Sequence, residues 1–559
     1  MGALVSSMEH LGTLPECLKH LSEAAPEKEL FVFYSEDGRR VLTALEVYQM
    51  SGRFANRLKQ EGFQRHDVVC NTLPNSPERV ITDLGILFAG CTPMNAHALL
   101  ADGSDLFHVL KVSKCRAVIV SDEANSNAHK VLQPFYKSDS TQSFVELRHE
   151  HLPSLSTAVV VSRRSTPPFL ALMSSPELEI FSETLEPSDL AYVFCTSGTT
   201  GFSKLVPRTH HEFLSWTRMF LDSLFPGQRV AHPRDVTTTI FDDRLLGWIG
   251  GIPLVTLCNG VTRVLMDVYA GPTRVTDKWD ACLREKCLSV NLMPRDAEVM
   301  VSHATTQGTL NQDVVIATAG QPLTQAQIKK LLCLSKKVFV TYASTETGTM
   351  STGAVSDSTF ENFYCGKVSP HLSLKIVNEA GEVCEPGTFG SIHVKGPFVM
   401  KKYFNQCDDP DPSTVQAFTP DGWFITGDYG SLDAEGNLYV MGRNRDVIMH
   451  GTYFVYPGWI EKKILEHSEV IDVCVVPVSD PNTHHRICAC IKLSTGSQLT
   501  ESDVIKHLKQ AFLTVDDALS PVPEYVMIFQ DDFPLTHSGK AHREKIRQMA
   551  EEKYGRPSS

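Results

Sequence analysis

Three short apolar runs after Leu190 lead directly into small polar residues. They occupy residues 191–197 (AYVFCTS), 314–320 (VVIATAG) and 337–344 (KVFVTYAS). Apolar runs of this length that end in glycine, serine or threonine are typical of buried strands followed by turns. In open α/β sheets, ligands bind outside the carboxyl ends of the strands. The pattern therefore predicts an α/β fold whose binding site lies at these three turns.

The remainder of the chain predicts the same fold class and a second domain. Up to about residue 135, amphipathic stretches alternate with β-branched runs, as expected for helices that cross over a mostly parallel sheet. Residues 137–190 are rich in serine, threonine and proline and predict one or two strands among exposed loops. After about residue 441 the order of strands and helices changes, and a basic tail follows. We expect a large N-terminal domain of several subdomains with mostly parallel sheets, and a small α+β C-terminal domain.

Composition and charge exclude several functional classes. The formal charge is -13, so no overall basic field favours nucleic acid. No apolar run is long enough for a transmembrane helix, and the first residues have neither a basic signal region nor an arginine-rich transit pattern, so we expect a cytoplasmic protein. The 15 scattered cysteines are expected to be reduced thiols. Gly2 followed by Ser6 fits the loose N-myristoylation pattern, which many chains match by chance.

The strongest local signal follows the first apolar run. Glycines there allow backbone amides to approach an anion, hydroxyl groups can donate to phosphate oxygens, and a lysine adds a positive charge. The residues are Thr196, Ser197, Gly198, Thr199, Thr200, Gly201, Phe202, Ser203 and Lys204. The spacing from Gly198 to Lys204 differs from that of a Walker A loop. The segment predicts a phosphate-binding loop, and an ordinary polar turn is the alternative.

Two further segments carry groups suited to a nucleotide. In Thr341–Glu346, an aromatic ring at the strand end can stack on adenine, and the hydroxyl and carboxylate that follow can bind phosphate and Mg²⁺. In Gly422–Asp428, the final carboxylate can accept hydrogen bonds from two vicinal hydroxyls, which suits a ribose.

Five segments in order resemble the motifs of the adenylate-forming superfamily, which includes acyl-CoA synthetases, adenylation domains of peptide synthetases and beetle luciferases. The phosphate loop resembles T-S-G-[ST]-T-G-x-P-K-G, with Ser203 for proline and Leu205 for glycine. Residues 342–346 resemble Y-G-x-T-E, with Ala343 for glycine, and residues 423–428 resemble [YW]-x-x-T-G-D. Residues 442–446 resemble G-R-x-x-D, and residues 534–543 resemble the C-terminal lysine motif.

The resemblance implies a role for each matching residue. Tyr342 takes the base, Thr345 the α-phosphate and Glu346 the metal, while Asp428 and Arg443 hold the ribose and phosphate. The implied catalytic residues are Lys540, Glu346, Thr345 and Lys204, with Lys540 the principal one. The implied nucleotide-binding residues are Thr196, Ser197, Gly198, Thr199, Thr200, Gly201, Lys204, Gly320, Gln321, Pro322, Tyr342, Ala343, Ser344, Thr345, Asp428, Arg443 and Lys540.

The resemblance also implies a mechanism in two steps. A small-molecule carboxylic acid, fatty or aryl, attacks Mg·ATP to give acyl-AMP and pyrophosphate, and coenzyme A then takes the acyl group. Arg445 is the implied hinge between an AMP-binding domain of residues 1–444 and a mobile C-terminal domain of residues 445–559. The expected class is an AMP-forming acid–thiol ligase with ATP, Mg²⁺ and coenzyme A.

Two segments leave alternatives open. Around Thr452 and Trp459 the chain departs from the family pattern for the thiol acceptor, so an amino-acid-type or luciferase-like enzyme, or a ligand-binding relative without catalysis, stays possible. Residues 241–251 fall where the family builds the acyl pocket, and Trp248 with the nearby glycines suits an aryl or medium alkyl chain. A helix capped by Asp242 or Asp243, with Arg244 paired on the surface, is the structural alternative. A third interpretation has one aspartate bind an amino group.

Overall fold

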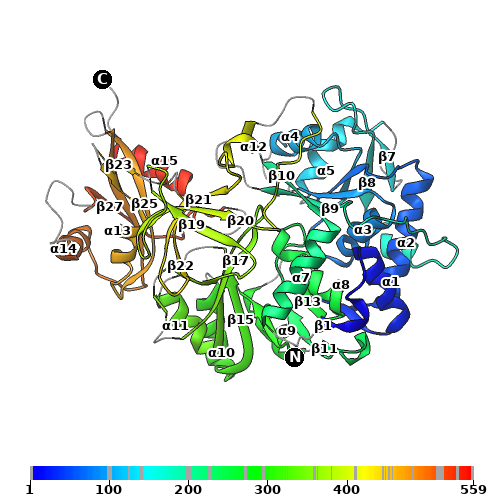
Figure 1. Ribbon diagram of the computed structural model, residues 1–559, viewed down its shortest axis with the longest axis horizontal. Coiled ribbons are helices and arrows are strands. Elements are labelled where there is room, and N and C mark those ends of the chain that lie inside the picture. The colour runs from blue at the N-terminus through cyan, green and yellow to red at the C-terminus, as the bar shows by residue number, and fades with distance from the viewer. Residues whose placement is uncertain are drawn as a thin grey trace.

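The computed structural model describes most of the chain, as Figure 1 shows. The described residues are 4–555 apart from 97–102, 124–125, 138–142, 197–202, 225–228, 270–273, 293–295, 321–322, 324, 357–359, 362, 379, 408–411, 444–445, 447, 451–452, 456, 481–483, 512–521 and 537–539. No helix within these residues is long and apolar enough to span a membrane.

The first sheet has seven strands in the order β10-β9-β5-β4-β6-β8-β7. These strands are β4 (Val68–Asn71), β5 (Thr92–Asn95), β6 (Ala117–Ser121), β7 (Phe144–Glu146), β8 (Thr157–Val161), β9 (Leu190–Thr196) and β10 (Lys204–Thr209). The five inner strands are parallel, and β7 and β10 are antiparallel edge strands. The two strands expected between residues 137 and 190 are β7 and β8, and β8 pairs directly with β6.

The second sheet has thirteen strands in the order β19-β20-β21-β22-β18-β17-β16-β15-β14-β12-β13-β2-β3. Its strands are β2 (Glu29–Ser35), β3 (Gly38–Thr43), β12 (Thr239–Phe241), β13 (Thr262–Met266), β14 (Ser289–Asn291), β15 (Gln312–Ala319), β16 (Ser335–Ser344), β17 (Gly348–Val355), β18 (Tyr364–Val368), β19 (Ser373–Val377), β20 (Phe389–Lys395), β21 (Phe424–Leu432) and β22 (Asn437–Arg443). The strands from β2 to β16 along this order are parallel, and those from β16 to β19 are antiparallel. The predicted strand ends after β15 and β16 therefore lie side by side.

Helices cover these sheets, and their first turns carry sequence signals for helix initiation. In both α1 and α2, a threonine N-cap and a glutamate three residues later form a capping box, which satisfies backbone N–H groups that have no partner within the helix. The α-helices are α1 (Leu14–Ala24), α2 (Ala44–Gln60), α3 (Pro77–Phe88), α4 (Ser104–Val112), α5 (Asn127–Leu132), α6 (Phe169–Met173), α7 (His210–Leu224), α8 (Leu254–Asn259), α9 (Val275–Arg284), α10 (Ala297–Gln307), α11 (Gln325–Leu334) and α12 (Pro412–Gln416). The 3-10 helices are η1 (Ser6–Met8), η2 (Gln133–Phe135), η3 (Pro233–Asp235) and η4 (Ile249–Gly251). A short pair of strands, β1 (Leu4–Val5) and β11 (Arg229–Val230), joins the N-terminus to the segment after α7.

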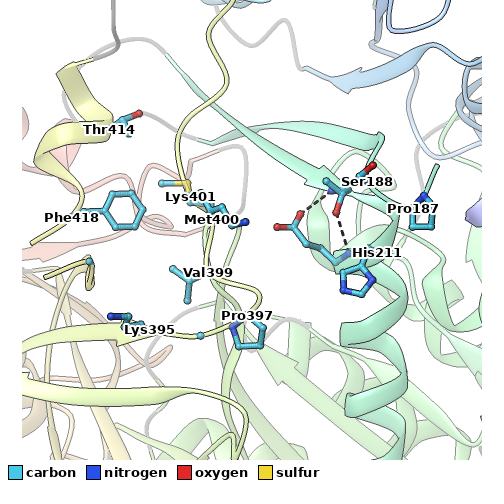
Figure 2. Close-up of a pocket in the computed structure, with 14 residues that line it drawn as sticks. Pro187, Ser188, His211, Lys395, Pro397, Val399, Met400, Lys401, Thr414 and Phe418 are labelled. Carbon is cyan, nitrogen blue, oxygen red and sulfur yellow. Dashed lines mark hydrogen bonds between the residues drawn. The ribbon is translucent and has the colours of Figure 1, made fainter. Parts of the chain in front are cut away.

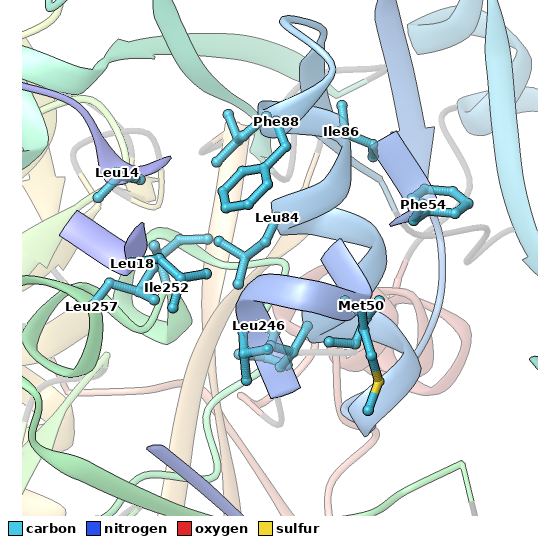
Figure 3. Close-up of a cluster of buried hydrophobic side chains, with 14 of the residues drawn as sticks. Leu14, Leu18, Met50, Phe54, Leu84, Ile86, Phe88, Leu246, Ile252 and Leu257 are labelled. Carbon is cyan, nitrogen blue, oxygen red and sulfur yellow. The ribbon is translucent and has the colours of Figure 1, made fainter. Parts of the chain in front are cut away.

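A hydrophobic core joins helices α1, α2 and α3 to the segment around residues 246–257 (Figure 3). Leu18 of α1 and Leu84 of α3 are completely or almost completely buried in it. Leu246 and Ile252 belong to the same cluster, although they lie more than 150 residues further along the chain. This packing fixes the segment after β12, the predicted acyl-binding segment, against the first helices.

The C-terminal part forms a small unit with its own core, drawn in orange and red in Figure 1. Its strands β23 (Ile448–His450), β24 (Tyr453–Val455), β25 (Val470–Asp480) and β26 (His484–Leu493) have the order β24-β23-β26-β25, and β27 (Tyr525–Phe529) runs parallel beside β26. The helices are α13 (Pro457–Ile464), α14 (Glu501–Ala511) and α15 (Arg543–Tyr554). The expected α+β unit is therefore present. The exact boundary at residues 444 and 445 falls outside the described residues and stays a prediction.

A buried arginine joins α3 to the carboxyl ends of β4 and β5. Arg79 is 1% exposed, and its Nε donates to Asp83 Oδ2 at 2.8 Å. The other guanidinium nitrogens donate to the carbonyls of Asn71 and Leu73 and to Asn95 Oδ1. Because Asp83 is also buried, Arg79 compensates a carboxylate that water does not reach.

We expect Arg79→Met to lower the free energy of unfolding by about 3–5 kcal/mol, since it leaves the Asp83 charge buried and unpaired. Arg57→Met is the matched control, because the Arg57–Glu61 pair on α2 is exposed and such pairs contribute about 0–1 kcal/mol. Urea denaturation followed by tryptophan fluorescence measures both variants. Equal midpoints for the two variants would contradict a structural role for the buried pair.

Candidate active site

The described residues at the base of the predicted phosphate loop are Thr196, Ser203 and Lys204. Thr196 ends β9 and Lys204 begins β10, and the two are cross-strand partners. The Thr196 hydroxyl donates to the Lys204 carbonyl at 3.4 Å. The loop therefore leaves one strand and re-enters the adjacent antiparallel strand. Its tip, which carries Ser197, Gly198, Thr199, Thr200 and Gly201, lies outside the described residues, so their binding roles stay predictions.

Lys204 and Glu346 are connected through Tyr403. The Lys204 Nζ lies over the Tyr403 ring, 4.8 Å from its centroid, in a cation–π contact. The Tyr403 hydroxyl donates to Glu346 Oε1 at 3.3 Å. The predicted phosphate-binding cation and the predicted metal ligand thus contact the same buried tyrosine. Tyr403 was not predicted from the sequence, where it stands after two lysines.

The turn that carries Thr345 and Glu346 is fixed by backbone contacts. Arg208 of β10 is buried, and its guanidinium donates to the Thr345 carbonyl at 2.7 Å and to the Phe398 carbonyl at 2.6 Å. The backbone N–H of Met400 donates to the Glu346 carbonyl at 2.8 Å. The turn is therefore held from both sides, by β10 and by the segment after β20. Arg208 was not predicted from the sequence either.

Tyr342, Asp428 and Arg443 meet although they come from three strands. The Tyr342 hydroxyl donates to the Asp428 carboxylate, and Arg443 Nε lies 3.1 Å from Asp428 Oδ1. Asp428 of β21 and Arg443 of β22 are cross-strand partners. Burial raises the pKa of Asp428, and the Arg443 cation and the Tyr342 hydrogen bond oppose this shift. The structure thus brings together three residues predicted to bind the nucleotide.

Three flanking residues, Gly320, Ala343 and Ser344, lie at the same edge of the sheet. Gly320 follows β15 with φ of +97°, in the region that favours glycine, and Ala319 of β15 pairs with Thr341 of β16. Gly320 therefore lies next to the strand end that carries Tyr342. Ala343 and Ser344 end β16, where the register of the β16–β17 pair shifts after Tyr342. Gln321 and Pro322 lie outside the described residues.

Lys540 of the C-terminal unit lies within electrostatic range of Asp428 and Arg443. Its backbone is bonded to Thr536, since Thr536 N–H donates to the Lys540 carbonyl at 2.7 Å and Lys540 N–H donates to Thr536 Oγ1 at 3.2 Å. Lys540 as a whole residue is exposed. Burial of its ammonium lowers its pKa, the Arg443 cation lowers it further, and the Asp428 carboxylate opposes this shift. Lys540 therefore acts electrostatically on the Asp428–Arg443 pair across the junction between the two parts of the chain.

The base of the C-terminal lysine segment is also anchored by the motif at residues 442–446. Arg543 begins α15, and its Nε lies 3.5 Å from Asp446 Oδ2. Arg543 also pairs with Glu461 of α13 and donates to the Val475 carbonyl at 2.8 Å. Arg445, the predicted hinge, lies outside the described residues.

The carboxylates of the predicted acyl-binding segment are neutralised within the protein. Asp242 accepts from Arg244 Nε and Nη2 at 2.9 and 2.8 Å, and the buried Arg263 lies 3.7 Å away. Asp243 pairs with Lys278 Nζ at 3.0 Å and accepts from the Met266 N–H. Both aspartates are already paired, which argues against the interpretation that one of them binds an amino group.

The expectation of a helix capped at Asp242 or Asp243 was wrong. Phe241 ends β12, and the next regular element is η4 at Ile249–Gly251. The aspartates cap nothing because their oxygens bind Arg244, Lys278 and the Met266 N–H instead. The local sequence resembled a helix start, but Asp242 forms a local ion pair with Arg244 and Asp243 binds the distant Lys278 and Met266 N–H.

A cavity of about 1080 Å³ lies beside this site, between the start of α7 and the segment after β20 (Figure 2). Apolar side chains of Val399, Met400 and Phe418 and the exposed Lys395 and Lys401 line it. No residue predicted to bind the nucleotide is among its described lining residues. It borders the site through Met400, whose N–H donates to the Glu346 carbonyl, and through Thr414, whose hydroxyl accepts from the Tyr403 N–H at 3.1 Å.

Comparisons with known proteins show the family of the chain. The family model described as AMP-binding enzyme matches residues 18–404, and the model described as AMP-binding enzyme C-terminal domain matches residues 459–540. The chain is 26% identical over 562 residues to the medium-chain acyl-CoA ligase ACSF2 of Danio rerio, covering 97% of this chain and 89% of that protein. It is 24% identical over 573 residues to the putative acyl-CoA synthetase YngI of Bacillus subtilis, covering 98% of each.

Solved structures show the same fold. ATP-bound MatB from Rhodopseudomonas palustris superposes with a TM-score of 0.78 at 19% identity, covering 97% of this chain and 99% of that one. The O-succinylbenzoate coenzyme A synthetase MenE from Bacillus subtilis in complex with AMP gives 0.73 at 21% identity, covering 95% and 98%. The first family model alone covers more than half of the chain, and it spans the strands that carry Lys204 and Tyr342 and the turn that carries Glu346. The chain therefore belongs to the AMP-binding enzyme family, the adenylate-forming ligases whose motifs its sequence resembles.

Proposed function

We propose that this chain joins a fatty or aryl carboxylic acid to AMP and then transfers the acyl group to coenzyme A. In the first step a carboxylate oxygen attacks the α-phosphorus of ATP, the bond to the bridging oxygen of the β-phosphate breaks, and pyrophosphate leaves. In the second step the thiol sulfur attacks the acyl carbon and AMP leaves. Both steps depend mainly on positioning and charge neutralisation.

The observation that carries this proposal is the position of Lys540. It comes from the C-terminal unit, and it lies close enough to Asp428 and Arg443 for their charges to affect its pKa. Negative charge accumulates on the carboxylate and the α-phosphate as they approach, so a cation at this place lowers the barrier of the first step. The arrangement supports Lys540 as the catalytic cation of acyl-AMP formation.

Glu346 is the proposed ligand of Mg²⁺. Mg²⁺ prefers oxygen ligands and is usually held by one or two carboxylates together with substrate phosphates. Among the described residues no cluster of three or more histidine, cysteine, aspartate or glutamate side chains forms a metal site, which fits an ion shared with ATP. Tyr403 and the Met400 N–H hold the Glu346 side chain and backbone, so the carboxylate is oriented before a metal binds.

Different observations support the proposed substrate class and the proposed acceptor. The paired Asp242 and Asp243 leave no carboxylate ready for a substrate amino group, so we propose an acid without one. The related ACSF2 proteins are described as medium-chain acyl-CoA ligases, which makes medium-chain acids the first to test and coenzyme A the proposed acceptor.

For the second step, we propose that the C-terminal domain rotates about Arg445 and withdraws Lys540.

Pyrophosphate release with Lys540→Ala tests the first step. We expect this variant to release pyrophosphate about 10²- to 10³-fold more slowly than wild type, because it lacks a cation at the site of developing charge. Lys545→Ala is the matched control, since Lys545 is an exposed lysine on the following helix. Wild-type rates in the Lys540 variant would refute its catalytic role.

A panel of fatty, aryl and amino acids, with and without coenzyme A, tests the substrate and acceptor. We expect pyrophosphate release with fatty or aryl acids, and acyl-CoA by mass spectrometry only when coenzyme A is present. Activity confined to amino acids would exclude the proposed substrate class. Steady pyrophosphate release without any acyl-CoA would exclude coenzyme A as the acceptor.

Arg445→Pro tests the hinge. A proline fixes φ near −65°, so it restricts rotation at that residue. We expect acyl-AMP formation to stay within about threefold of wild type while thioester formation slows by at least about tenfold, on the scale of gated conformational steps. Rapid-quench measurement of each half-reaction separates the two, and equal losses in both would rule out a hinge at this position.

A further inference from the structure

The base of the phosphate loop departs from the family motif at Ser203, where the motif has a proline. A proline restricts its own backbone and has no N–H to satisfy. Serine at this position frees the backbone and adds one N–H donor and one hydroxyl. The chain therefore needs another device to keep the loop in place.

Asp105 supplies that device. The Ser203 N–H donates to Asp105 Oδ1 at 2.7 Å, and the Ser203 hydroxyl donates to Asp105 Oδ2 at 2.7 Å. Each carboxylate oxygen thus accepts one hydrogen bond from the same residue. Hydrogen bonds to an ionised carboxylate are short and roughly twice as strong as neutral ones. The two contacts fix both the backbone and the side chain of Ser203.

We propose that Asp105 is a positioning residue for Ser203 and Lys204 at the base of the phosphate loop, and that it replaces the conformational restriction that proline provides in the family motif. Its clamp on Ser203 is adjacent to Lys204, whose ammonium lies over Tyr403. A residue fixed one position before Lys204 sets the direction in which the lysine leaves the strand. The proposal rests on the proposed function, because it assigns Asp105 to ATP binding in that reaction.

Asp105 stands at a place where its own negative charge is accommodated. It lies in the first turn of α4, where the helix macrodipole favours an anion. Both of its oxygens face hydrogen-bond donors of Ser203. These contacts offset part of the repulsion that a carboxylate near a phosphate-binding loop exerts on ATP.

The other end of α4 contacts the segment that follows Tyr403. The Val112 carbonyl accepts from the Gln406 N–H at 2.9 Å, and the Leu205 carbonyl of β10 accepts from the Phe404 N–H at 2.7 Å. Helix α4 therefore spans from the base of the phosphate loop to the chain that carries Tyr403. A rigid helix with both ends attached keeps Lys204 and Tyr403 in a constant relative position.

The test compares Asp105→Ala in two backgrounds by measuring pyrophosphate release at varied ATP. In wild type, we expect the substitution to lower kcat/KM for ATP by about 10- to 100-fold, since it removes two charge-assisted hydrogen bonds. In a Ser203→Pro background, we expect at most about threefold loss from the same substitution, because proline restricts the backbone itself and has no N–H to leave unpaired. The KM for the acid should change by less than about threefold in both.

Two further variants separate positioning from general stability. Asp105→Asn keeps the shape of the side chain and one acceptor. On a logarithmic scale, we therefore expect its loss of kcat/KM to be less than half the loss in Asp105→Ala. Asp277→Ala is the matched control, since Asp277 is an acidic residue in the first turn of α9, where it accepts from the Arg274 N–H. We expect wild-type kcat/KM in that control.

Equal losses from Asp105→Ala in the two backgrounds, or no loss in wild type, would overturn the proposal. A readout independent of turnover is the rise in Tm on adding ATP, which should shrink in Asp105→Ala and return when Ser203→Pro is added. If wild type releases no pyrophosphate with any acid, the proposed function fails. The Tm readout still decides the role of Asp105 in that case.

Discussion

The buried carboxylate of Asp428 is the group on which the arrangement of the site depends. A charge buried this deeply, at 7% exposure, is tolerated only when other groups compensate it. Arg443 supplies the opposite charge from the adjacent strand, Tyr342 supplies a hydrogen bond from β16, and Lys540 adds a second cation from the C-terminal unit. One acidic side chain thus determines where three separate segments of the chain must meet.

A second set of contacts holds the phosphate-binding side of the site. Arg208 joins β10 to the turn at Thr345, and Tyr403 lies between Lys204 and Glu346. The Arg208–Thr345 and Lys204–Tyr403 contacts connect β10 of the first sheet to segments of the second sheet, and the Tyr403–Glu346 contact joins two of those segments to each other. The proposed catalytic groups Lys204 and Glu346 are therefore linked within the N-terminal part. Such preorganisation reduces the rearrangement needed when charge develops during the reaction.

The sequence alone predicts those parts of the site whose residues lie close together in the chain. The strands β9, β15 and β16 and the turns after them follow from short apolar runs, and the Asp428–Arg443 pair lies on two strands joined by a short connection. Arg208 and Tyr403 could not be found this way, because their partners lie 137 and 57 residues away in the sequence.

In the segment after Phe241, the sequence instead suggested a helix start that the structure does not have. Its aspartates look like helix caps, but Asp242 pairs with the neighbouring Arg244 and Asp243 with the distant Lys278, so ion pairs take the place of helix capping here.

The contacts at the junction between the two parts of the chain fit the proposed rotation about Arg445. Arg443 is the last residue of β22 and is paired with Asp428 inside the second sheet, whereas β23 begins at Ile448. Only four residues separate the two strands, and Asp446 among them pairs with Arg543 at the start of α15. In the proposed rotation about Arg445, the Asp446–Arg543 ion pair would keep Asp446 and the start of α15 together. Arg443 belongs to β22, so Asp428 would keep this charge partner when Lys540 withdraws.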